Sequence, residues 1–105
     1  MGWFSGMFSK RPTDFAKTLV DKIYRQFPPA SEPQLAKKGA RRRLEGVIEH
    51  IMSDVEDFNR EMRLGWIGKA RLGNALLWGL KERGYSKEFA EAVTTGIVKL
   101  LAASK

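Results

Sequence analysis

The residues best suited to chemistry are His50, the only histidine, and the carboxylates near it. Asp54 lies four residues after His50, so on a helix the two side chains lie on the same face. An imidazole and a carboxylate supply two metal ligands, whereas a stable site needs three or four that converge. The Glu-x-x-His pair of di-iron bundles requires a carboxylate at the position of Val47. We therefore expect no metal site, and a histidine that is solvated or locally hydrogen-bonded.

Signatures of enzymes and of cofactor binding are absent from the sequence. The ten glycines form neither GxGxxG nor GxxxxGKS/T, the loops that hold phosphates. The absence of cysteine excludes disulfides and thiolate metal ligands, and it fits a reducing compartment. The longest charge-free stretches have nine residues, far below the roughly 20 that span a bilayer. We expect a cytoplasmic protein with no catalytic residue and no cofactor, either free or attached to a membrane surface.

A basic cluster is the more informative group of side chains. It consists of Lys37, Lys38, Arg41, Arg42 and Arg43, five cations within seven residues. On a helix it contains like-charged pairs four residues apart, each unfavourable by roughly 0.3 kcal/mol. Two interpretations stay open: a solvated or protein-paired basic face, or a site for the phosphates of lipid headgroups or nucleic acid.

The formal net charge of +7 is distributed unevenly. Residues 1–43 hold ten Lys or Arg against three Asp or Glu, whereas residues 44–105 hold nine of each sign. The whole excess therefore lies in the first part of the chain. This asymmetry indicates a region that attaches to an anionic partner, joined to a neutral folded body.

The N-terminal segment, residues 1–12, combines large apolar side chains with cations. Its candidate contact residues are Trp3, Phe4, Met7, Phe8, Lys10 and Arg11. On a helix the four apolar residues share one face and the cations follow at its end, which suits the headgroup region of an anionic membrane. Packing onto the chain's own core and insertion into a protein partner stay open as alternatives.

The hydrophobic periodicity predicts four helices and no strand. The expected helices cover about residues 13–27, 31–62, 65–83 and 86–102. Thr13, Ser31 and Ser86 are the expected N-caps, with Gln34 completing a capping box at the second helix. Gly84 is expected at a left-handed exit from the third helix. Whether the second helix continues through Gly39 is left open.

A seam of apolar residues in the second helix alternates spacings of four and three. It consists of Leu44, Ile48, Ile51, Val55, Phe58 and Met62. The seam lasts just under three heptads, which is short for a free-standing coiled coil. We interpret it as the buried stripe of a long central helix, with a helix interface between two copies of the chain as the alternative.

The third expected helix is apolar around most of its circumference. Trp66 falls with four leucines on the main apolar stripe, and Ile67 and Trp78 extend that stripe on its other side. Gly68, Ala75 and Gly79 form a further side. A helix of this kind is either central in the fold or part of an oligomer interface, because small residues let a second backbone approach closely.

Together these patterns predict an all-α fold: a single small four-helix domain over residues 13–105 with a long central helix, preceded by the amphipathic attachment segment 1–12. We expect a non-enzymatic attachment or adaptor protein that docks on an anionic surface, either a membrane face or a membrane-bound complex. Two alternatives stay open. One is a small basic nucleic-acid-associated protein that binds phosphates through Lys37–Arg43, and the other is an obligate helical subunit or homodimer.

Overall fold

The computed structural model describes residues 11–103, which are all-helical and contain no strand. Its elements are α1 (Pro12–Gln26), the 3-10 helix η1 (Pro29–Ala36), α2 (Lys38–Met62), α3 (Trp66–Glu82) and α4 (Lys87–Ala103). The expected all-α class is confirmed. The structure differs from the expected four helices by one element, η1, which lies between the first two α-helices.

The start of α1 differs from the sequence-based expectation. The helix begins at Pro12 and its N-cap is Arg11, so the prediction that Thr13 is the N-cap is wrong. Proline suits the first helical position, because the missing N–H would have no partner there and φ is already close to helical. At the other end the helix stops before Pro28, since proline disfavours helical geometry in the residue that precedes it.

The expected capping box at Ser31 and Gln34 does not form. Both residues lie inside η1, which has no side-chain cap at its start. Pro29 and Pro33 each lack a backbone N–H, so this segment cannot build a regular α-helical ladder and forms shorter 3-10 turns instead. The long helix α2 starts only at Lys38 and runs unbroken through Gly39.

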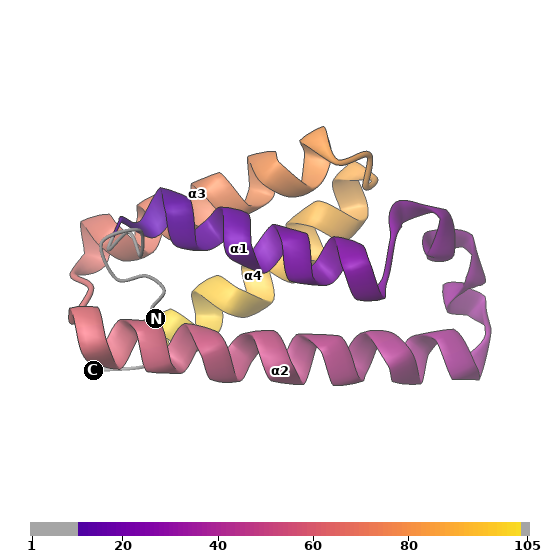
Figure 1. The fold of residues 1–105 in the computed structure, drawn as a ribbon, viewed down its shortest axis with the longest axis horizontal. Helices are drawn as coiled ribbons and strands as arrows, with labels where there is room; N and C mark the ends of the chain where they lie inside the picture. Colours follow the sequence, from indigo (N-terminus) through magenta and orange to yellow (C-terminus); the bar gives the residue numbers. More distant parts are fainter. Residues whose placement is uncertain (1–10, 104–105) are drawn as a thin grey trace.

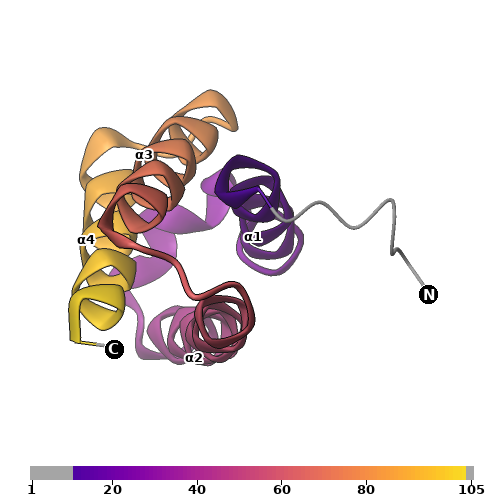
Figure 2. The same cartoon turned by 90° about the vertical axis from the view of Figure 1, so that its left-hand side faces the viewer.

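The four α-helices form a bundle in which α1 packs closely on α3, and α3 on α4 (Figure 1). α2 lies along the remaining side against α1, α4 and η1, as the view along α2 shows (Figure 2). α1 and α3 run in one direction, and α2 and α4 return. One end of the bundle therefore holds the starts of α1 and α3, and the opposite end holds η1 and the start of α2. α2 is the longest helix, but α3 has the closest packing on its neighbours.

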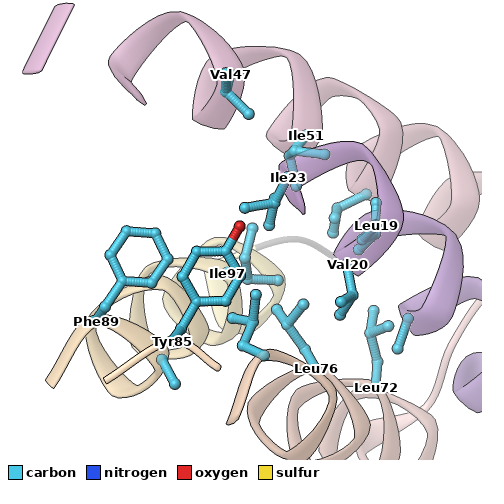
Figure 3. Packing of buried hydrophobic residues seen from close by; sticks show 14 of the residues in the cluster. Leu19, Val20, Ile23, Val47, Ile51, Leu72, Leu76, Tyr85, Phe89 and Ile97 are labelled. Atoms are coloured by element: carbon cyan, nitrogen blue, oxygen red, sulfur yellow. The ribbon is translucent and has the colours of Figure 1, made fainter. Parts of the chain in front are cut away.

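The core lies between all four α-helices. Side chains from α1 and α3 point toward one another in Figure 3, and those from α2 and α4 close the cluster. The largest fully buried side chains are Leu19, Ile23, Phe27, Ile51, Val55, Leu72, Leu76, Leu80, Ile97 and Leu101. None of the helices within residues 11–103 is long and apolar enough to cross a bilayer.

Two glycines of α3 explain how closely its neighbours approach. A Cβ added at Gly79 would lie 2.9 Å from a methyl group of Val20 on α1. A Cβ added at Gly73 would lie 2.8 Å from a methyl group of Val98 on α4. In the sequence pattern, Gly79 belongs to the side of the third helix that carries small residues. In the structure, this side packs against α1 of the same chain.

Polar contacts fix the connections at the η1 end of the bundle. The Tyr85 hydroxyl donates to the Phe27 carbonyl at 2.5 Å, where α1 ends. Gly84 has φ of +101°, so the predicted left-handed exit from α3 is confirmed. Ser86 caps α4 as predicted, because its Oγ accepts a hydrogen bond from the Phe89 N–H at 3.1 Å. These contacts hold the ends of α1 and α3 together at the start of α4.

Candidate functional site

The basic cluster surrounds the start of α2. Lys37 is the N-cap of the helix, and Lys38, Arg41, Arg42 and Arg43 follow in its first two turns. All five residues are exposed, and none forms an ion pair with another part of residues 11–103. The first turn of α2 contains no acidic residue, so the positive end of the helix dipole adds to the charge of the cluster. The result is a concentrated positive field at this end of the bundle.

Arg43 differs from the rest of the cluster in its surroundings. Its guanidinium carbon lies 5.9 Å from the ring centroid of Phe27, at the C-terminal end of α1. Part of this side chain therefore packs over an aromatic ring instead of extending freely into solvent.

The N-terminal segment joins α1 at the other end of the bundle. Arg11, its last candidate contact residue, is exposed and pairs with Asp14 at 3.1 Å. The remaining candidates, Trp3, Phe4, Met7, Phe8 and Lys10, lie outside the described residues. α2 alone spans about 37 Å, and α1, whose N-cap is Arg11, begins at the end opposite the start of α2 (Figure 1). Arg11 and the cluster therefore do not form one continuous patch.

The seam of α2 faces the inside of the bundle along its middle part. Ile51, Val55 and Phe58 are buried, and the Phe58 ring stacks on Phe15 of α1 with 4.0 Å between centroids. Leu44, Ile48 and Met62 are half-buried. The middle of the seam is thus an intramolecular packing surface, while its first two residues border open space.

His50 is exposed on α2. Asp54, its potential partner one turn later, instead pairs with Lys22 of α1 at 2.6 Å. In the part of the chain from 11 to 103, no three His, Cys, Asp or Glu residues come together as a metal site would require.

Among residues 11–103, α3 carries the most exposed large apolar side chains. Trp66 is 79% exposed, Trp78 is 55% exposed and Ile67 is 54% exposed. Ile67 and Trp78 are eleven residues apart on one face, about 16 Å along the helix. Trp66 shares its stripe with the buried leucines of α3 by its spacing, yet it is exposed because it is the first residue of the helix.

Cations accompany these apolar residues. Lys81 places its Nζ 4.9 Å from the ring centroid of Trp78. Arg71 is exposed on the same helix, and the exposed Arg63 ends α2 just before α3 begins. Glu82, at the last position, is the only acidic residue of α3. We call Arg63, Trp66, Ile67, Arg71, Trp78 and Lys81 the α3 face.

A second apolar surface is an open groove between η1, α2 and α4, with a volume of about 440 Å³. Leu44 and Ile48 of the seam line one wall, and Phe89 and Val93 of α4 line the other. The lining is largely apolar, whereas a smaller hollow between α1 and α3, at Lys17 and Glu82, is mainly polar.

Sequence reasoning missed the α3 face and the groove for different reasons. α3 is apolar nearly all round, so periodicity alone does not separate its inward and outward sides. The excess of apolar residues beyond one stripe was the signal that some of them stay exposed. The groove exists only because η1, α2 and α4 meet, and no local pattern encodes that meeting.

No protein-family model matches the chain, and no curated protein or solved structure matches it either.

Proposed function

We propose that this protein is a non-enzymatic attachment or adaptor protein that docks on the anionic face of a membrane. The observation that carries the proposal is the α3 face, where Trp66, Ile67 and Trp78 are exposed beside cations. Large exposed apolar side chains of this kind mark interaction surfaces on folded proteins. The flanking cations favour an anionic surface over a neutral one.

The combination of aromatic and basic side chains suits the headgroup layer. Tryptophan is enriched at that depth because its apolar ring and its polar N–H are both satisfied there. Each Lys or Arg near an anionic leaflet contributes about 1 kcal/mol. Apolar insertion and electrostatic attraction together supply the two signals that stable attachment needs, and no covalent bond is made or broken.

The position of the N-terminal segment supports the same orientation. Arg11 lies at the end of the bundle where α3 begins with Trp66 (Figure 1). Trp3, Phe4, Met7, Phe8 and Lys10 precede it in the chain and have the composition of an interfacial anchor. We propose that this segment and the α3 face contact the same membrane, and that the rest of the bundle is a platform.

Co-sedimentation with vesicles tests this proposal. The full chain should pellet with vesicles of mixed phosphatidylserine and phosphatidylcholine and should bind pure phosphatidylcholine more weakly. Ile67→Ser combined with Trp78→Ser should weaken binding about tenfold, since two buried apolar side chains contribute more than 1.4 kcal/mol. Tyr24→Ser, which removes an exposed aromatic ring from α1, is the matched control. Equal losses in both variants would contradict the proposal.

Nucleic-acid binding through Lys37–Arg43 is the second candidate function. It is favoured by five exposed cations around one helix start, without an ion pair in the described chain. Such binding should weaken steeply with salt and should be lost on Arg41/Arg42/Arg43→Gln. It should be unaffected by Ile67→Ser and Trp78→Ser. The same set of variants therefore distinguishes the two candidate functions.

A further inference from the structure

The groove between η1, α2 and α4 has the dimensions of a site for a short helix. Leu44, Ile48 and Met52 line it from three successive turns of α2, over about 12 Å. A bound helix presents anchor residues at positions i, i+4 and i+7, which span about 10 Å. The length of the apolar wall therefore matches three anchors of one amphipathic helix.

The opposite wall leaves room for these anchors. Ala92 and Gly96 of α4 are small residues that line the groove together with the larger Phe89 and Val93. The nearest atom to a Cβ added at Gly96 would be the Met52 methyl group, at 3.7 Å. Methionine adapts its shape readily, so this side of the groove can adjust to different anchors.

The charged residues that line the groove are the carboxylates Glu32 and Glu88, and no Lys or Arg in the described part of the chain lines it. Glu45 and Glu49 directly follow the wall residues Leu44 and Ile48, and Glu88 lines the groove on α4. All three are exposed, and none forms an ion pair within residues 11–103. Carboxylates on both sides of an apolar groove favour a partner with cations beside its apolar face.

We infer that this groove binds a short amphipathic helix of a partner protein, with apolar anchors at i, i+4 and i+7 and Lys or Arg beside them. Carboxylates in the lining disfavour the phosphates of lipid headgroups and nucleic acid inside the groove. The inference goes beyond the proposed membrane attachment, because the groove lies between α2 and α4 and includes no residue of the α3 face.

The test is fluorescence anisotropy of a labelled helical peptide with leucines at i, i+4 and i+7 and lysines at the other positions. A matched peptide carries glutamate in place of every lysine. The full chain, without lipid present, should bind the lysine peptide about tenfold more tightly than the glutamate peptide. Because the chain as a whole is basic, non-specific attraction would give the opposite order.

Substitutions at the groove test whether the lysine peptide binds there. Ala92→Trp fills the groove from an exposed position and should abolish binding of the lysine peptide. Ala102→Trp places the same side chain on α4 at an exposed position outside the groove and should leave binding unchanged. Glu45→Lys combined with Glu49→Lys alters only exposed residues and should reverse the preference between the two peptides.

Three results would overturn the inference. One is equal affinity for the two peptides, and another is unchanged binding in Ala92→Trp. The third is a dimer of the chain that Ala92→Trp dissociates, since the groove would then hold a second copy. Circular dichroism of each variant confirms that a loss of binding is not a loss of fold. The peptide assay contains no lipid, so its result does not depend on whether the protein binds vesicles.

Discussion

The carboxylate of Glu32 accepts two hydrogen bonds from Ser86, one from its backbone N–H at 2.8 Å and one from its hydroxyl at 2.7 Å. In a capping box the N–H of the N-cap residue is bonded by a Glu or Gln three positions later in the helix. That position in α4 is Phe89, which lies in the core. Glu32 of η1 supplies the missing acceptor from 54 residues away, and so joins η1 to the start of α4.

Glu32→Ala should lower the free energy of unfolding by about 1–2 kcal/mol, because it removes the acceptor at a helix N-terminus and a charge favoured by the helix dipole. Urea denaturation followed by circular dichroism measures the change. Glu56→Ala, at an exposed position within α2, should change stability by less than about 0.5 kcal/mol. If the two variants lost the same amount, the Glu32–Ser86 contact would not stabilise the fold as described.

Tyr85 makes the stability of the fold depend on pH in the alkaline range. Its side chain is buried, and burial, followed by the nearby Glu32, raises its pKa from 10.0 to about 12. Since the unfolded chain loses the phenolic proton first, the stabilisation is complete below pH 10 and falls as the pH rises toward 12. The wild-type protein should therefore lose about 1 kcal/mol more than Tyr85→Phe between pH 9 and pH 11.

At neutral pH, the difference in stability between the wild type and Tyr85→Phe measures the contribution of the Tyr85 hydrogen bond. There Tyr85→Phe should cost about 1–2 kcal/mol, because the Phe27 carbonyl loses the donor at 2.5 Å. Urea titrations of both proteins at each pH provide the four free energies. Parallel pH profiles for wild type and Tyr85→Phe would show that the hydroxyl is not the titrating group.

Two glycine-to-alanine substitutions should change the stability of the protein in opposite directions. Gly46→Ala should stabilise the protein by up to about 1 kcal/mol, because alanine favours the helix and nothing lies within 4 Å of the new Cβ. Gly79→Ala gains the same propensity but forces its Cβ to 2.9 Å from Val20. Overpacking costs about 1–3 kcal/mol, so Gly79→Ala should be destabilising overall.

Thermal denaturation followed by circular dichroism compares the two glycine variants. In a Val20→Ala background, Gly79→Ala should cost less than it does in the wild type, because the methyl group that the new Cβ meets is absent. A stabilising effect of Gly79→Ala would show that α1 and α3 do not approach as closely as described.

The parts of the fold that could be predicted are those with local causes. Ser86 precedes an apolar stripe and caps α4, and Gly84 supplies the positive φ that ends α3. Pro28 and Pro29 end α1 because their effect on the backbone depends only on neighbouring residues. In each case the determining interaction lies within a few residues along the sequence.

The parts that could not be predicted depend on distant residues. Glu32 follows Ser31 in what resembles a capping box, yet its carboxylate caps a helix that starts much later in the chain. Trp66 has the right spacing to join the buried leucines of α3, but its place at the helix start leaves it exposed. Leu44 and Ile48 continue the seam, and only the path of η1 and α4 leaves them beside an open groove.

Tryptophan quenching tests whether the α3 face enters the headgroup layer of an anionic membrane. The protein has three tryptophans, so Trp3→Phe leaves only Trp66 and Trp78 as reporters. With vesicles that contain phosphatidylserine and bromine-labelled acyl chains, we predict a blue shift and strong quenching of this emission. Binding of this variant without quenching, or the absence of any binding, would contradict the account.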